Sequence, residues 1–520
     1  MIDTFHFLDE PLLSFGAGQL AEDPRDGLAL FGPSDQRSQL GENVVIGTPA
    51  GIELWSTWVS ALNSPAACTN VARQRPWPPY PGFDVAFGTA WPTPAKTYAV
   101  DAEALQAAAR KADRRERAYA VANLYLAPMQ QIEKLDAKPA VAICVVPDEV
   151  YQNCRPKSSV KEISDVRRSA DQREFLRDVL KDHQVGQGRM FDDQDSGLGE
   201  APRGLEQYGL SPDFRRQLKA RMMAHELPVQ IILESTLKIT EQVRFGQPGT
   251  NPLSDRLWNL GTALFYKMGL KPWKTPWARD GVCYIGLAYR RVDRGKGTAC
   301  CAAQMFLDSG DGIVFVGEFG PWYSEERNEF HLTATAAEKL LRGTLETYRQ
   351  QDGRPLREIF LHARSGINHT EYAGLLKACP PGVRLVGIRV CQDRHGPRLY
   401  RYDAHPEVSR RGMHPVLRGI LWQRTKRHGL LFTTGFKPRI ATYDGWEVPV
   451  PLSVTVQHGD AELLQVARDI LGLTKLNYNA CQPGESQPIT VKYSDRVGEI
   501  LLANPDLPQH DWRHNFKYYV

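Results

Sequence analysis

The sequence of 520 residues lacks several features that would assign it to a specialised class of protein. It has no run of about 18 apolar residues, so neither a membrane-spanning helix nor a membrane partner is expected. The first ten residues carry acids and no basic region before an apolar core, so no signal peptide is expected. Internal repeats and low-complexity tracts are also missing. A chain of this length and ordinary composition has room for roughly two to four globular domains.

Cysteine is sparse and shows no metal-binding pattern. The nine cysteines are scattered, and no two of them form a Cys-x-x-Cys pair. Cys300 and Cys301 are adjacent, but neither has a metal-ligand spacing to a histidine. This usage predicts a reduced, cytoplasmic chain with buried thiols.

The chain has no large excess of charge of either sign. A net charge of +4 excludes a generic polyanion binder that works through its overall charge. Positive charge gathers locally around Trp422, at Arg410, Arg411, Arg424, Lys426, Arg427, His428, Lys437 and Arg439. Such a cluster suits a nucleic-acid backbone, although a solvated face is the simpler interpretation of this cluster alone.

Five polar residues carry the strongest functional signal. Arg215 and Lys219 lie four apart, so they share one face of a predicted helix. Gln230 follows a proline and precedes an apolar run, which is typical of the start of a buried strand. With Thr236 and Lys267, the set offers charged and neutral donors of the kind that a phosphate pocket needs. The same spacing also fits an amphipathic surface helix beside an ordinary strand.

The first half of the chain predicts a turn-rich region followed by an α/β domain. Residues 1–130 are rich in turns, and residues 155–212 form a long polar insertion. The predicted elements are a helix over 102–123, a strand over 141–146, a helix near 171–182, a helix over 212–225, a strand over 229–233 and a helix over 255–268. Their alternation is typical of a doubly wound sheet.

The second half predicts a different α/β domain that begins near residue 280. The predicted order is strands over 282–289, 299–307 and 313–319, a helix over 333–349, a strand over 357–362, a helix over 370–377 and a strand over 384–390. Three strands, helix, strand, helix, strand is the order of the ribonuclease H fold. Hairpins around 398–456, a helix over 460–471 and a final helix after 488–495 complete the prediction.

Taken together, these motifs resemble the C-terminal half of an Argonaute protein, in which a MID domain precedes a ribonuclease H-like PIWI domain. Segments similar to PIWI landmarks follow in order at 284–288, 361–366, 475–479 and 488–490. The segments 10–16 and 23–33 resemble the opening of short prokaryotic Argonautes, which carry only MID and PIWI domains. The resemblance implies an α/β protein with three parts: an N-terminal region over 1–130 that packs on the rest, a Rossmann-like MID domain over 131–279 and a PIWI domain over 280–520.

The resemblance also implies a guide-binding site. The residues that match the family's pocket for the 5′-phosphate of a guide strand are Arg215, Lys219, Gln230, Thr236 and Lys267. In many Argonautes the C-terminal carboxylate reaches this pocket and helps to hold a Mg²⁺ ion with the guide phosphate. Here Val520 would supply the carboxylate and Gln230 an amide oxygen, so Mg²⁺ is the expected cofactor.

The nuclease site of the PIWI domain is expected to be inactive. An active site uses acids to hold two metal ions, which activate water and stabilise the leaving oxygen. Ala288 and Ser365 stand where the family has the first two of these acids, and Asp495 is the acid that is retained. One carboxylate cannot hold two divalent cations, so no catalytic residue is assigned.

The resemblance implies an RNA-guided sensor of invading DNA in prokaryotic immunity. The expected partners are a guide RNA with a 5′-phosphate, a complementary single-stranded DNA, and a separate APAZ-containing effector protein of TIR, SIR2 or DNase type. Guide pairing would supply sequence specificity while the protein grips backbone and shape.

Two other interpretations stay open. A nuclease with a rearranged site would use Asp495 with Glu318 or Asp308. A plain α/β enzyme would need a nucleotide-binding loop, but no strand precedes the loose match at 16–21, and 295–298 lacks the upstream glycine of a P-loop. Both segments fit turns, and His362 is expected to be structural.

Overall fold

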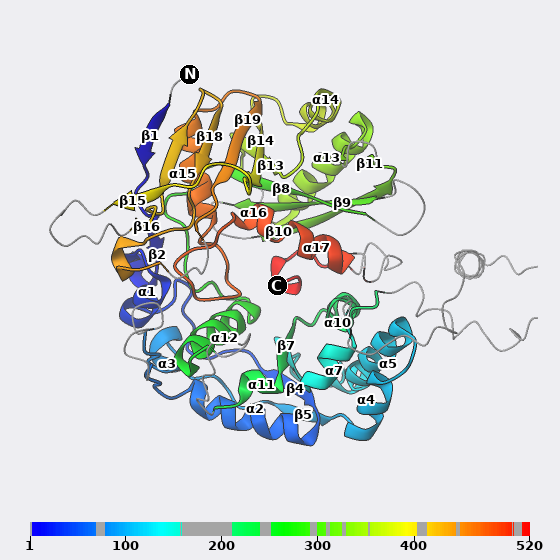
Figure 1. Ribbon diagram of the computed structural model, residues 1–520. Helices are drawn as coiled ribbons and strands as arrows, with labels where there is room; N and C mark the ends of the chain where they lie inside the picture. The colour runs from blue at the N-terminus through cyan, green and yellow to red at the C-terminus, as the bar shows by residue number, and fades with distance from the viewer. Residues whose placement is uncertain are drawn as a thin grey trace, which may run out of the picture.

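The computed structural model describes residues 3–68, 78–155, 158, 211–239, 251–291, 299–307, 312–324, 329–351, 354–402, 413–443, 448–501, 503 and 512–520. The helix expected near 171–182 and almost all of the insertion around it lie outside these residues. The segment 295–298 and the side chains of Asp308, Arg410 and Arg411 also lie outside them. Two large sheets organise the described residues, one in each half of the view in Figure 1.

The smaller sheet has four parallel strands in the order β5-β4-β6-β7. Its strands are β4 (Asn43–Gly47), β5 (Lys96–Ala99), β6 (Val141–Val146) and β7 (Val229–Leu233). β6 is buried on both faces. Its odd-numbered residues pack in the cluster that includes α2 (Pro49–Leu62) and α12 (Leu253–Lys267). Its even-numbered residues pack against α4 (Ala102–Ala109), α5 (Arg114–Leu126) and α10 (Phe214–Met222). Helices on both faces explain why β6 is an unbroken apolar run.

Two expectations about this half differ from the structure. The N-terminal strands β4 and β5 belong to the same sheet as β6 and β7, so the division expected near residue 131 runs through that sheet. The helix expected over 102–123 is instead two helices, α4 and α5. The second begins directly after Asp113, whose carboxylate accepts from the main-chain nitrogens of Arg115 and Glu116 and so caps a new helix.

The larger sheet has nine strands in the order β1-β17-β18-β19-β14-β13-β8-β9-β10. Its parallel centre consists of β8 (Val282–Arg291), β13 (Glu358–Ala363) and β14 (Arg384–Gln392). Antiparallel strands flank this centre: β9 (Ala299–Leu307), β10 (Gly312–Gly320), β19 (Leu452–His458), β18 (His428–Leu431), β17 (Ile420–Gln423) and β1 (Thr4–Phe7). The strand order expected of a ribonuclease H fold is confirmed.

Helices cover both faces of this sheet's centre. α13 (Ala334–Gln351) and α14 (His369–Ala378) pack on one face, whereas α15 (Leu463–Leu473), α16 (Ile489–Lys492) and α17 (Ser494–Leu501) pack on the other. At Gly286 of β8 the approach is so close that a Cβ atom would lie 2.0 Å from the main-chain oxygen of Thr490 in α16. Only glycine fits there, which explains the glycine of the 284–288 segment.

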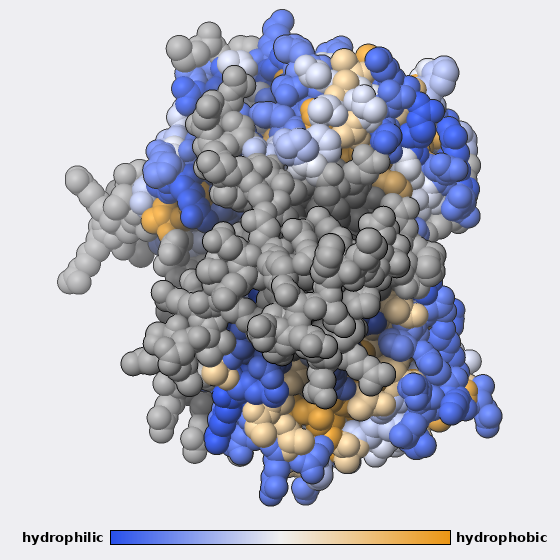
Figure 2. All heavy atoms as spheres, turned by 90° about the vertical axis from the view of Figure 1, so that its right-hand side faces the viewer, coloured by the Kyte–Doolittle hydropathy of each residue, from blue (hydrophilic) through white to orange (hydrophobic). Residues whose placement is uncertain are grey.

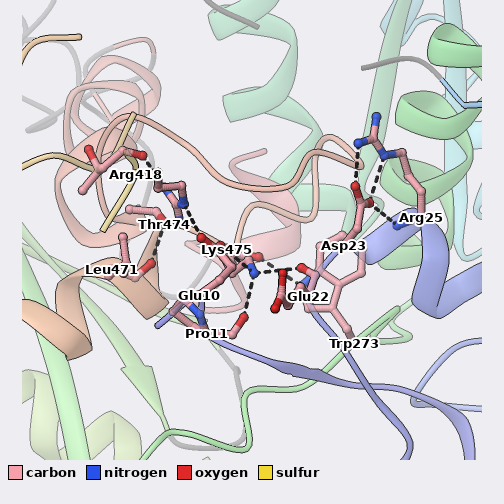
Figure 3. A network of polar contacts seen from close by, with 11 residues as sticks. Glu10, Pro11, Glu22, Asp23, Arg25, Trp273, Arg418, Leu471, Thr474 and Lys475 are labelled. Carbon is pink, nitrogen blue, oxygen red and sulfur yellow. Dashed lines mark hydrogen bonds and ion pairs between the residues drawn. The ribbon is translucent and has the colours of Figure 1, made fainter. Parts of the chain in front are cut away.

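A buried ionic network ties the N-terminal segment to the far end of the chain (Figure 3). Glu10 accepts from the Nε of Arg418 at 2.8 Å and pairs with the Nζ of Lys475 at 2.7 Å. Lys475 also donates to the main-chain oxygens of Pro11 and Glu22. Burial raises the pKa of Glu10, but the charges of Arg418 and Lys475 outweigh it and hold that pKa at about 2. The network therefore fixes the path of the chain between β1 and the first helix.

Hydrophilic and hydrophobic residues are unevenly distributed over the outer surface. Figure 2 shows the side on which α13, α14, α4 and α5 lie, where the upper part is mainly hydrophilic and the lower part carries a patch of apolar side chains. Among the described residues, no helix has both the length and the apolar character needed to cross a membrane.

Candidate functional site

An open pocket of about 340 Å³ lies where the two sheets' helices meet the end of the chain. Its lining is strongly polar. It comes from α7 (Asp148–Asn153), α10, β7, the segment around Asn479, α17 and the last two residues. The polar lining residues are Tyr151, Asp213, Arg215, Arg216, Lys219, Gln230, Asn479, Arg496, Glu499 and Tyr519.

Helix α10 presents two of the expected cations to this pocket. Asp213 caps the helix by accepting from the main-chain nitrogen of Arg216, and Arg215 and Lys219 then fall on the same face. Arg215 is exposed, and its guanidinium lies 5.5 Å from the centre of the Tyr151 ring. A stacked guanidinium of this kind is held in place yet keeps its donors free for an anion.

Lys219 and Lys267 converge on one oxygen. The Nζ of Lys219 donates to the main-chain oxygen of Val520 at 2.7 Å, and the Nζ of Lys267 donates to the same oxygen. Lys267 is the last residue of α12 and is 1% exposed. It also donates to the main-chain oxygen of Lys517 at 3.3 Å. The Val520 oxygen, which lines the pocket, is thus held by two lysines, of which Lys219 is itself a lining residue and Lys267 lies behind the lining.

The pKa values of both lysines are depressed. Burial lowers the pKa of Lys219 well below its usual value, and the nearby charges of Lys267 and Arg215 lower it further. Burial and the charges of Lys517 and Arg215 lower the pKa of Lys267 to about 7. An anion in the pocket would reverse this effect by favouring the protonated lysines.

Gln230 and Thr236 have different positions relative to the pocket. Gln230 lies in β7, is half-buried and lines the pocket. Thr236 lies in α11 (Glu234–Leu237) and is not among the lining residues. Its main-chain oxygen accepts from Arg256 at 2.6 Å. The structure thus brings Arg215, Lys219 and Gln230 together in the lining. Lys267 and Thr236 both lie outside the lining, and Lys267 contacts it through Val520.

Among the lining residues that did not follow from the sequence pattern are Tyr151, Asn479 and Arg496. Asn479 ends the 475–479 segment, and its main-chain nitrogen donates to the Oδ1 of Asn477 at 3.0 Å. The hydroxyl of Tyr493 donates to that same Oδ1 at 2.6 Å, and Arg496 lies 5.0 Å from the Tyr493 ring. These residues are distant in sequence from α10, so no local spacing marks them as neighbours.

Not every cation of the lining is available to a ligand. Arg216 pairs with Glu499 at 2.8 Å and with Asp213 at 3.4 Å. Arg215 and Arg496, in contrast, are both exposed. The pocket therefore retains excess positive charge together with the amides of Gln230 and Asn479, an arrangement that suits a phosphate group.

The donor set does not fit a preformed magnesium site. The Val520 oxygen that was expected to hold the ion already accepts from two lysines, and a divalent cation beside them would meet strong repulsion. Among the described residues, no group of three or more histidines, cysteines or acids is placed to hold a metal ion. Binding of Mg²⁺ with the ligand stays a prediction from the resemblance.

The expected nuclease positions lie at one edge of the larger sheet. Gly286 of β8 is in register with His362 of β13, and both parallel strands run on to the same edge. Ala288 lies two residues further along β8, and Ser365 follows the end of β13. Asp495 is the second residue of α17. This is the edge where a parallel α/β sheet normally presents its reactive groups.

His362 has a structural environment. It is buried, and its Nδ1 lies 2.9 Å from the hydroxyl of Thr490 in α16. Burial lowers its pKa to about 3, so the ring is neutral at physiological pH. It helps to fix α16 against the sheet, as expected from the sequence.

Comparison with solved structures identifies the fold. Clostridium butyricum Argonaute, bound to a guide DNA and a 19-mer target DNA, matches with a TM-score of 0.60 at 15% identity, covering 98% of this chain and 54% of that one. A. aeolicus Argonaute, and Aa-Ago with externally bound siRNA, each match with a TM-score of 0.53 at 14% identity, covering 96% of this chain and 54% of those. The chain thus spans about half the length of these proteins.

These matches show an Argonaute-like fold. The expected class, an α/β protein with a Rossmann-like MID part followed by a ribonuclease H-like PIWI part, is confirmed. No protein-family model and no curated protein sequence matches the chain. At 14–15% identity the likeness concerns the fold, so function has to be argued from the site.

Proposed function

We propose that the chain binds the 5′-phosphate end of a guide RNA in the pocket formed by α10, β7 and Val520. The observation that carries this proposal is the convergence of Arg215, Lys219 and Gln230 around one pocket, with Lys267 bonded to the Val520 oxygen. A half-buried lysine, a buried lysine and an exposed, stacked arginine suit the charge of a terminal phosphate dianion. The Argonaute-like fold adds support, because two of the matching structures carry guide, target or siRNA strands.

The pocket is tested by removing its cations one at a time. Lys219→Ala and Lys267→Ala should each weaken binding of a 5′-phosphorylated RNA roughly ten- to a hundredfold, since a charge-assisted contact to phosphate is worth about 1.5–3 kcal/mol. Fluorescence anisotropy with otherwise identical 5′-phosphate and 5′-hydroxyl strands gives the two dissociation constants. Lys134→Ala, at an exposed lysine in another region, is the matched control. Equal losses for both strands would assign the lysines to general electrostatics.

The chain then pairs its guide with complementary single-stranded DNA without cutting it. Ala288 and Ser365 supply no carboxylate at the edge where β8 and β13 end, so two metal ions would lack their ligands. Enzymatic activity would belong to a separate APAZ-containing effector protein, and the pair would act in prokaryotic immunity. Base pairing of guide and target would activate the effector by shifting the conformation of the complex. This requires that the paired strands bind the active and inactive conformations with different affinities.

The second candidate function is guide-dependent cleavage by a rearranged site. Asp495, retained in α17, is the observation that keeps it open. Target cutting by the isolated chain in Mg²⁺ or Mn²⁺ would favour it, and an Asp495→Asn variant would then have to abolish the cutting.

A further inference from the structure

The N-terminal thirty residues carry an unusual share of the exposed apolar surface. Five of the nine large apolar side chains that are exposed in the described part of the chain fall within residues 5–30: Phe5, Phe7, Leu12, Leu20 and Leu30. They come from β1, from the segment before β2 (Leu13–Ser14), from β3 (Leu20–Ala21) and from α1 (Pro24–Phe31). Figure 1 shows β1, β2 and α1 following one another down the left side of the molecule. We call these five side chains the N-terminal strip.

The strand β1 ends the larger sheet, and its outer edge pairs with no other strand of the described part of the chain. Its only strand partner in the described part of the chain is β17, to which it pairs antiparallel. The main-chain nitrogen of Leu8 donates to the main-chain oxygen of Gly419 at 2.9 Å, so the main-chain groups of Leu8 point toward β17. Because this direction alternates along a strand, the main-chain groups of His6 also point toward β17. The main-chain groups of Phe5 and Phe7 therefore point away from the sheet. Their side chains are 54% and 53% exposed.

An open edge with exposed phenylalanines at alternate positions is a template for another strand. Unpaired main-chain donors and acceptors give such an edge its affinity for an added strand, and alternate side chains give specificity. Phe5 already stacks on Trp422 with ring centres 5.3 Å apart, so the aromatic surface continues onto β17. Contiguous apolar surface of this kind marks a site of protein association.

The charge of this region identifies the kind of partner. Residues 3–31 hold six acids and one arginine. Four of these acids are paired with cations: Asp3 with Arg424, Glu10 with Arg418 and Lys475, Asp23 with Arg25, and Asp26 with Arg439. The arginine, Arg25, is buried and paired with Asp23. Asp9 and Glu22 are exposed and form no ion pair with another residue of the described part. The two unpaired carboxylates beside exposed apolar side chains complement a protein segment with apolar and basic residues.

We propose that β1 and the N-terminal strip dock an extended segment of the partner protein, which adds a strand to the edge of the larger sheet. The segment pairs with the main chain of Phe5 and Phe7, places apolar side chains beside theirs, and carries basic residues toward Asp9 and Glu22. This inference rests on the proposed function, because the partner is the separate effector protein proposed above.

The test is co-expression of the full chain with the protein encoded beside it, followed by size-exclusion chromatography and measurement of the dissociation constant. Phe5→Ser combined with Phe7→Ser should weaken the complex at least tenfold. Val85→Ser combined with Leu376→Ser removes two apolar side chains that are each 51% exposed elsewhere, and it should leave the complex unchanged. Phe7→Pro is a second probe. It removes the main-chain N–H of residue 7, which points away from the sheet, while β1 keeps its hydrogen bonds to β17. Proline is tolerated at such an edge position.

The outcomes separate this inference from the function on which it rests. Wild-type affinity in all β1 variants would overturn the docking surface and leave guide binding and the partner intact. Failure of the two proteins to associate would overturn both the partner and the surface. A dimer of the chain that the Phe5 and Phe7 changes dissociate, or nucleic-acid binding that they reduce, would also overturn the inference by assigning the surface another occupant.

Discussion

Burial and neighbouring cations lower the pKa values of both Lys219 and Lys267. The two Nζ atoms share the main-chain oxygen of Val520, and the pKa of Lys267 lies at about 7. A phosphate dianion that enters the pocket stabilises the protonated form of each lysine. Binding is therefore accompanied by proton uptake whenever the free chain has lost a proton from this pair.

Affinity for a 5′-phosphorylated strand should consequently fall as the pH rises above 7. Uptake of one proton corresponds to a decrease of about tenfold per pH unit at most. Anisotropy titrations between pH 6.5 and 9 measure it, with a 5′-hydroxyl strand as the control that should change less. Lys267→Arg keeps its charge throughout this range and should flatten the profile. A profile as steep for the hydroxyl strand as for the phosphate strand would contradict the coupling.

The elements of the fold were more predictable from the sequence than the site was. Strands β6, β7 and β9 have the predicted bounds, because apolar runs flanked by turn residues specify buried strands. The prediction of one continuous helix over 102–123 was wrong. The apolar periodicity continues across Asp113, but the Asp113 side chain caps a new helix there. Tyr151, Asn479 and Arg496 reach the pocket only through tertiary packing, and their spacing in the sequence carries no such signal.

The contact between β8 and α16 gives a prediction at the scale of these elements. Gly286→Ala should destabilise the chain by about 1–3 kcal/mol, because the new Cβ would overlap the main-chain oxygen of Thr490 and force α16 away from the sheet. Chemical denaturation followed by fluorescence measures the change. Gly366→Ala is the matched control, since its Cβ would approach no main-chain atom and would meet only the side-chain amide of Gln457, at 3.2 Å. Equal stability of both variants would show that α16 is not held this closely.

At the scale of the whole molecule, the network around Glu10 joins the two ends of the sequence. Its carboxylate is ionised between Arg418 and Lys475, and its pKa lies at about 2, against an ordinary value of 4.5. A carboxyl group with a depressed pKa contributes stability that is fully present above its unfolded pKa. That contribution is lost as the pH falls from about 4.5 to 2.

Glu10→Gln should destabilise the folded chain at pH 7 by about 3–5 kcal/mol, because it leaves two buried cations without their counter-ion. The difference between variant and wild type should shrink as the pH falls below 4.5. Thermal unfolding across this range measures both effects. Asp9→Asn, at the exposed neighbour, should behave as the wild type at every pH. A constant difference between Glu10→Gln and the wild type down to pH 2 would show that ionisation of Glu10 does not stabilise the fold.

The central claim is that the chain holds a guide by its 5′-phosphate and retains a complementary DNA without cutting it. The most direct measurement mixes the purified chain with a 5′-phosphorylated guide RNA and an end-labelled complementary single-stranded DNA in Mg²⁺ or Mn²⁺. Native and denaturing gels of the same samples report retention and length. The account predicts that the DNA is retained at full length with the matched guide, and that retention is lost with a mismatched guide or with Lys219→Ala. Cleavage of the DNA at one defined position, or retention that does not depend on the guide, would contradict the account.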